Sequence, residues 1–267
     1  MDNYIDSYVK ILNRNTFKSW YYVDPFSGSG LIKIDNNCIF PGSPLIPLFK
    51  TEKYPFHKYI LSDKNPRYIQ SLKKVVAEKI NKPNESKQNL NIDIQTVDCN
   101  SLIQKIFTGT KPIHWKNRSY LVFLDPFGWN IKWNSMERIL NSGPVDIIFT
   151  FMTWGIRWNM TIEKSRKTLN DFFGDKEWQS IENNTEIVDY YCNKIKRFGY
   201  KNTYNTYTID VSTTSGNTYN LILASQSPGA GNVFTDLQKR VNEVTTDCLK
   251  AAFNVIIGKT TDLTKFF

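Results

Sequence analysis

Residues 21–30, "YYVDPFSGSG", decide the fold, because a short apolar run ends abruptly in Asp-Pro and a glycine turn. Residues 120–129, "YLVFLDPFGW", repeat the pattern after a longer apolar run. Continuous apolar runs of this kind are typical of strands that lie buried in a parallel sheet. We therefore interpret both Asp-Pro-Phe segments as strand ends, which meet at one edge when the strands are parallel.

Strands and helices alternate along most of the remaining chain. Residues 59–61 and residues 92–96 are strand-like, and each is followed by an acidic residue and a helical segment. Residues 145–153 are another apolar strand, and residues 155–199 read as mainly helical. Residues 204–227 then alternate as a hairpin around Ser215, Gly216 and Asn217, before a last helix over residues 232–249.

This order of elements predicts an α/β fold. We expect a Rossmann-like, doubly wound and mostly parallel seven-stranded sheet with an antiparallel C-terminal hairpin. A helical insertion at about residues 155–199 follows strand five. Residues 1–267 are expected to form a single domain, because a chain of 267 residues with 40% hydrophobic content can bury one large core.

Composition limits the classes of function. The chain has no run of 18 apolar residues and no apolar leader, and its four cysteines are scattered, which favours a reduced, cytoplasmic protein. Two histidines and no paired cysteines give no reason to expect a metal site. The 34 Lys and Arg residues against 25 Asp and Glu give a net charge of +9, which favours either a nucleic-acid partner or a general compositional bias.

The first glycine turn is the candidate cofactor loop, with Asp24, Phe26, Gly28 and Gly30 as its candidate binding residues. The two glycines allow the backbone to approach a ligand without a Cβ between them. The turn matches neither a dinucleotide fingerprint nor a P-loop. It therefore suits a nucleoside with an amino-acid tail better than a pyrophosphate, unless it is a plain tight turn.

Three further residues are cofactor candidates because of their positions beside strands. Asp63 follows the second strand, where a carboxylate can accept the hydroxyl hydrogens of a ribose. Asp98 follows the third strand, where an acid can accept from an adenine amino group, although both aspartates also suit helix caps or turns. Ser43 either contacts the tail of the cofactor or caps the next helix.

The second Asp-Pro-Phe segment is the candidate catalytic element. The Asp125 carboxylate and the Pro126 carbonyl can both accept from an exocyclic amino group and orient its lone pair toward an electrophilic methyl. An aromatic ring can stack on the target base, and the candidates are Phe127, Trp129 and Trp133. All three rings also suit a core or rim position.

One basic side chain completes the candidate set. Arg157 follows strand five and is a candidate for contact with substrate, or else a surface arginine.

The segments above, together with "GSPLIPL", "YILSDKNPRYIQSL", "LNDFFGDKEW" and "YNLILASQS", resemble in this order the three-Cys-motif partner protein (TcmP) family over residues 21–227. The chain also resembles, more distantly, the ribosomal-RNA adenine-N6 methyltransferases, although it has Asp-Pro-Phe-Gly in place of Asp-Pro-Pro-Tyr. The resemblance implies a fold that binds S-adenosylmethionine (SAM) and a partner protein with three cysteines.

The resemblance also implies roles for single residues. Asp24, Gly28 and Gly30 would line the methionine end of SAM. Asp63 would hold its ribose and Asp98 its adenine.

The leading hypothesis is a SAM-dependent methyltransferase that acts on an amino nitrogen of a base in RNA or DNA. The alternatives are a methyltransferase for a small molecule or protein, with a pocket formed by residues 155–199, and a catalytically silent partner subunit that keeps the SAM-type fold. The absence of a His or Cys nucleophile does not count against methyl transfer, which depends mainly on alignment.

Overall fold

The computed structural model describes residues 2–14, 18–33, 39–51, 54–80, 90–108, 117–198, 203–212, 218–227 and 229–241. Its strands are β1 Ser19–Asp24, β2 Leu31–Lys33, β3 Ile39–Pro41, β4 Lys58–Asp63, β5 Ile92–Thr96, β6 Arg118–Leu124, β7 Val145–Phe151, β8 Asn205–Ser212 and β9 Thr218–Ser225. Its helices are α1 Asp2–Arg14, α2 Leu45–Lys50, α3 Pro66–Ile80, α4 Cys99–Ile106, α5 Trp133–Leu140, α6 Ile156–Met160, α7 Glu163–Phe173, the 3₁₀ helix η2 Glu177–Ser180, α8 Asn184–Lys196 and α9 Ala230–Val241.

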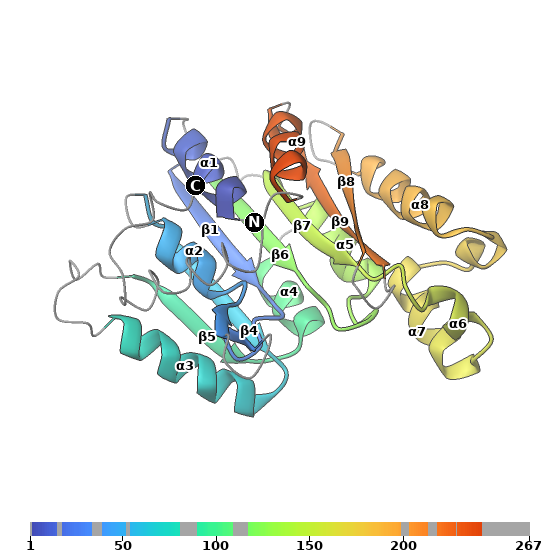
Figure 1. Ribbon diagram of the computed structural model, residues 1–267, viewed down its shortest axis with the longest axis horizontal. Helices are drawn as coiled ribbons and strands as arrows, with labels where there is room; N and C mark the ends of the chain where they lie inside the picture. The colour runs from blue at the N-terminus through green and yellow to red at the C-terminus, as the bar shows by residue number, and fades with distance from the viewer. Residues whose placement is uncertain are drawn as a thin grey trace.

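The main sheet has seven strands in the order β5-β4-β1-β6-β7-β9-β8 (Figure 1). Neighbours from β5 to β7 pair in parallel, whereas β9 pairs antiparallel with both β7 and β8. The sequence prediction of a mostly parallel α/β sheet with an antiparallel C-terminal hairpin is confirmed. Because strand order reverses beside β1, the carboxyl ends of β1, β4 and β6 border the switch point where such sheets bind ligands.

Two layers of helices cover the two faces of the sheet, and each layer has its own apolar core. Helices α1, α2, α3 and α9 pack on one face, and α4, α5, α7 and α8 pack on the other. Strand β6 shows the alternation that this requires: Leu121 and Phe123 enter one core, while Val122 and Leu124 enter the other. The sequence of β6 is continuously apolar because both faces of the sheet are buried there.

Two local features of the structure differ from the prediction made from the sequence. Strands β2 and β3 form a separate two-stranded sheet between β1 and α2. Helix α2 starts after Pro44 with no side-chain cap, so the cap predicted at Ser43 is wrong. Residues 215–217 of the predicted hairpin turn and residues 242–249 of the predicted last helix lie outside the described residues.

Within the described ranges, no helix combines the length and apolar content needed to cross a membrane.

Candidate functional site

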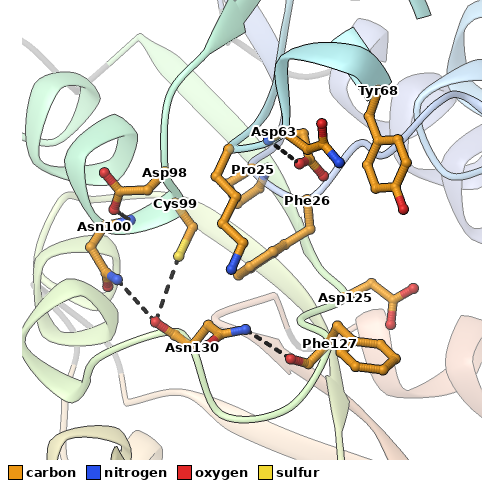
Figure 2. Close-up of a pocket in the computed structure, with 12 residues that line it drawn as sticks. Pro25, Phe26, Asp63, Tyr68, Asp98, Cys99, Asn100, Asp125, Phe127 and Asn130 are labelled. Atoms are coloured by element: carbon orange, nitrogen blue, oxygen red, sulfur yellow. Dashed lines mark hydrogen bonds between the residues drawn. The ribbon is translucent and has the colours of Figure 1, made fainter. Parts of the chain in front are cut away.

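A pocket of about 590 Å³ opens at the carboxyl edge of the parallel strands. Its lining includes Phe26 after β1, Asp63 at the end of β4, Asp98 after β5, and Asp125 and Phe127 after β6. Figure 2 shows these side chains on different sides of one hollow, although their elements are far apart in sequence. The structure thus brings together three of the predicted aspartates.

Asp24 lies under this pocket, with no exposed surface. Its Oδ2 accepts a hydrogen bond from Ser43 Oγ at 2.6 Å, and its Oδ1 accepts from the Phe26 amide at 3.0 Å. Burial raises the pKa of Asp24 to about 7, the charges of Asp125 and Asp63 add to the rise, and the two hydrogen bonds oppose it. Ser43 therefore holds the carboxyl that anchors the glycine turn.

The Asp63 carboxylate closes the glycine turn against β4. Its Oδ2 accepts from the Gly28 amide at 3.2 Å, and its Oδ1 accepts from the Asn65 amide at 2.7 Å. Each carboxylate oxygen has a second lone pair, so Asp63 can still accept from a ligand hydroxyl. Gly28 has a φ of 56°, and a Cβ there would meet nothing within 4 Å, which leaves space at the turn for a ligand.

Gly30 has a different environment from Gly28. It is buried, and a Cβ on it would come within 2.7 Å of Leu72 Cδ1. Its carbonyl accepts from the Gly42 amide at 2.8 Å, which ties the turn to the segment before α2. Gly30 thus supports the turn from inside.

Asp98 caps helix α4, as the structural alternative in the sequence analysis predicted. One of its oxygens accepts from the amides of Asn100 and Ser101. Partial burial opposes ionisation, but the hydrogen bonds from Ser101 and Asn100 hold the pKa of Asp98 below its usual value. Asp98 is therefore a fixed acceptor on the pocket wall. Burial raises the pKa of neighbouring Cys99 to about 12, so this thiol stays protonated at neutral pH.

The Asp-Pro-Phe segment after β6 forms the opposite wall. As a whole, Asp125 is an exposed residue. Its carboxyl is still partly desolvated by the pocket, which raises its pKa, while a hydrogen bond with Thr150 opposes the rise. Pro126 is buried beneath it, whereas the Phe127 ring is 95% exposed. Phe127 is therefore free to contact a ligand.

The predicted tryptophans divide between the rim and the core. Trp129 Nε1 donates to the Met152 carbonyl at 3.2 Å, so its ring joins the loop after β6 to the loop after β7. Trp133 is only 6% exposed and packs edge-on against Tyr191, with its Nε1 donating to Glu137 at 2.7 Å.

The core position of Trp133 means that stacking on a base would require the core to open, so we withdraw it as a stacking candidate. Arg157 lies on α6, but its side chain is outside the described residues.

The sequence analysis missed five charged, amide or aromatic residues of the pocket: Lys64, Asn65, Tyr68, Asn100 and Asn130. Asn100 Nδ2 donates to the Asn130 carbonyl at 2.9 Å and so links α4 to the loop after β6. Tyr68 is 49% exposed on the first turn of α3. The sequence did contain a signal that could have found them, because each lies within six residues of a predicted aspartate.

No protein-family model and no curated protein sequence matches the chain. Among solved structures, protein LPL1258 of Legionella pneumophila is 10% identical, with a TM-score of 0.55 over 90% of this chain and 89% of that one. The O-methyltransferase of Bacillus cereus, solved with SAH, is 10% identical with a TM-score of 0.46 over 84% of this chain and 80% of that one.

A third structure, Trm1 of Pyrococcus horikoshii with S-adenosyl-L-methionine, is 14% identical with a TM-score of 0.43 over 89% of this chain and 57% of that one. The overlap with LPL1258 covers nearly the whole of both chains, so this protein shares the fold of LPL1258.

Proposed function

We propose that the protein is a SAM-dependent methyltransferase whose acceptor is an exocyclic amino nitrogen of a nucleic-acid base. The observation that carries the proposal is the convergence of Asp63, Asp98 and Asp125 around one pocket of about 590 Å³ beside a glycine turn. Three carboxylates against one cation in the lining, Lys64, complement a ligand that carries positive charge and hydroxyl donors, as SAM does. The resemblance to the TcmP family supports the same cofactor.

The residues present fit this cofactor. Asp63 would accept from the ribose hydroxyls, and Asp98 would accept from the adenine amino group. The open space at Gly28 would admit the amino-acid tail of SAM. Asp24 and Ser43 would act from below by fixing the turn. When bound, SAM would supply a methyl group on an electron-poor sulfonium.

Asp125 and Pro126 would position the acceptor. The Asp125 carboxylate and the Pro126 carbonyl would accept the two N–H groups of the amine, so that its lone pair faces the pocket. The exposed Phe127 ring would stack on the base once it has left its helix or strand. Alignment of this kind supplies most of the rate enhancement that methyl transfer requires.

The experiment is transfer from methyl-labelled SAM to a mixture of RNA, DNA and protein, followed by separation of the fractions. We expect label in a nucleic-acid fraction, and a loss of at least about 100-fold for Asp125→Ala, since removing one transition-state contact costs about this much. Asp171→Ala is the control, because Asp171 is on the surface and its one ion pair with a described residue is the exposed pair with Lys132. Equal transfer by the wild type and Asp125→Ala would overturn the assigned role.

The second candidate is a catalytically silent, SAM-binding subunit of a three-Cys-motif protein. The near-complete exposure of Phe127 is compatible with this candidate as well, because a partner subunit could cover the ring as readily as a base could stack on it. SAM binding by calorimetry without label in any fraction would favour this candidate. Absence of SAM binding would reject both.

A further inference from the structure

Exposed aromatic rings gather at the carboxyl edge of the parallel strands. Among the side chains that the structure describes, the exposed aromatic ones are Tyr68, Phe127 and Trp154. Tyr68 lies on the first turn of α3 after β4, Phe127 lies in the loop after β6, and Trp154 lies in the loop after β7. Tyr68 and Phe127 line the pocket, whereas Trp154, which is 49% exposed, lies outside its lining. The function proposed above therefore gives no role to the Trp154 ring.

Trp129 holds the loop of Trp154 beside the loop of Phe127. Its Nε1 donates to the Met152 carbonyl at 3.2 Å, and a Cβ on Gly155 would lie 3.6 Å from Cη2 of its ring. Residues on both sides of Trp154 thus contact Trp129, which is two residues from Phe127 in the chain. Phe127 and Trp154 therefore stand on adjoining loops, one of which lines the pocket.

The backbone around Trp154 is held by hydrogen bonds. The Thr153 amide donates to the Phe151 carbonyl at 2.9 Å. The Gly155 carbonyl accepts from the Asn159 amide at 3.0 Å and from the Nδ2 of the same residue at 2.7 Å. An aromatic ring on a backbone fixed in this way loses little conformational freedom when a ligand covers it.

Helix α7 places cations beside this loop. Lys164, Arg166 and Lys167 are exposed on α7, and Figure 1 shows α6 and α7 beyond the carboxyl end of β7. Ser165 Oγ donates to Asn159 Oδ1 at 2.9 Å, which ties α7 to α6. Because the same asparagine also holds the loop after β7, the three cations are fixed on one unit with the exposed tryptophan.

The charges of this unit favour a polyanion, whereas those of the pocket do not. Residues 153–171 contain four basic and two acidic residues, and one of the acids, Asp171, is paired with Lys132. The pocket has three aspartates in its lining against one lysine. Phosphates are therefore attracted to α7 and repelled from the pocket, so the base is the part of a strand that enters the pocket.

We propose that Trp154 stacks on a nucleotide that flanks the target base, and that the cations of α7 bind phosphates of the same strand, which makes the substrate single-stranded nucleic acid. The inference rests on the proposed function for the position of the target base at Phe127. In a duplex, neighbouring bases cover both faces of each base, so an exposed ring can stack only on a base that is unpaired or displaced. Every base has a stacking face, so this surface adds affinity for a strand without a sequence preference.

The experiment measures binding without methyl transfer. Fluorescence anisotropy follows labelled single-stranded RNA and DNA of about 12 nucleotides, and a blunt duplex of the same length, with the full chain in excess SAH. We expect Trp154→Leu, which keeps the apolar volume without a ring, to weaken single-strand binding about tenfold, because one stacking contact is lost. Trp154→Phe should keep most of the affinity, since a ring remains, and duplex binding should be the same in both variants.

Ile162→Ala is the matched control. Ile162 lies between the same loop and α7 and is 52% exposed, but it has no ring. Its truncation removes apolar surface without stacking, so single-strand affinity should be unchanged. The double variant with Lys164→Gln and Lys167→Gln should lower the slope of log affinity against log salt by about one. Melting temperatures of the variants show that each is folded.

The inference and the proposed function fail in different ways. Unchanged single-strand affinity in Trp154→Leu, or no binding of any oligonucleotide, would overturn the inference. Equal losses in Trp154→Leu and Ile162→Ala would also overturn it, since they indicate an apolar surface that a protein partner covers. Binding that depends on the Trp154 ring, without label in any fraction of the transfer assay, would reject the proposed methyl transfer and retain the single-strand surface.

Discussion

At the scale of single residues, Asp24 controls the glycine turn at a cost in stability. Its pKa of about 7 lies above that of an unfolded aspartate, so the folded protein holds a proton there that the unfolded chain releases. This contribution to the free energy of unfolding therefore decreases as pH rises from about 4 to about 7. We expect Asp24→Asn, which keeps the Phe26 hydrogen bond, to remove this decrease, as measured by melting temperature at each pH.

The difference between wild type and variant isolates Asp24 from the other titrating groups. Asp171→Asn serves as the control, because an exposed surface acid leaves the pH profile nearly unchanged. If the melting temperatures of the wild type and of Asp24→Asn changed equally with pH over this range, the buried, proton-binding state of Asp24 would be contradicted.

At the scale of elements, the turn between β1 and β2 depends on the conformation of Gly28. An alanine there would keep a left-handed backbone at a cost of about 1 kcal/mol, with no steric clash. If the turn holds the cofactor, Gly28→Ala should lower SAM affinity by at least about tenfold, since the new methyl group occupies the ligand's space. Titration calorimetry measures the affinity, and urea unfolding measures the stability.

Gly128→Ala separates backbone strain from ligand contact. Gly128 also has a positive φ, of 88°, and open space around its Cβ, but it lies in the loop after β6. We expect a similar loss of stability with nearly unchanged SAM affinity. Equal loss of affinity in both variants would show that strain alone is responsible.

The elements also show what sequence can and cannot predict here. Asp63, Asp98 and Asp125 were found because each follows a recognisable strand, and parallel strands bring their carboxyl ends together. Trp133 was misjudged because a ring in an amphipathic helix can face either way, and only the packing against Tyr191 decides. Ser43 was misjudged because its partner, Asp24, is nineteen residues away.

At the scale of the whole molecule, the net charge of +9 is the sequence feature that favours a nucleic-acid partner. If RNA or DNA binds, association releases counterions, and the affinity should fall at least about tenfold between 50 and 200 mM salt. Fluorescence anisotropy with a labelled single-stranded oligonucleotide measures this. The affinity for SAM should change little over the same range, and a salt-independent oligonucleotide affinity would contradict the polyanion partner.

A second cavity, of about 300 Å³, lies between α8 and the β8–β9 hairpin, and the sequence alone could not predict it. Its wall combines α8 with two strands of the hairpin, and their contact depends on the reversal of β9. A pattern of alternating residues predicts the hairpin, but it contains no information about which helix packs beside it.

The reversed direction of β9 also means that separate stretches of the chain line the two cavities. Because β9 starts at the edge where the parallel strands end, the side chains of the second cavity come almost entirely from residues 184–220, whereas those of the first pocket come from residues 25–130. Selection can therefore alter one stretch and leave the other intact. A chimera in which residues 184–220 are replaced should therefore retain the cofactor affinity of the original chain.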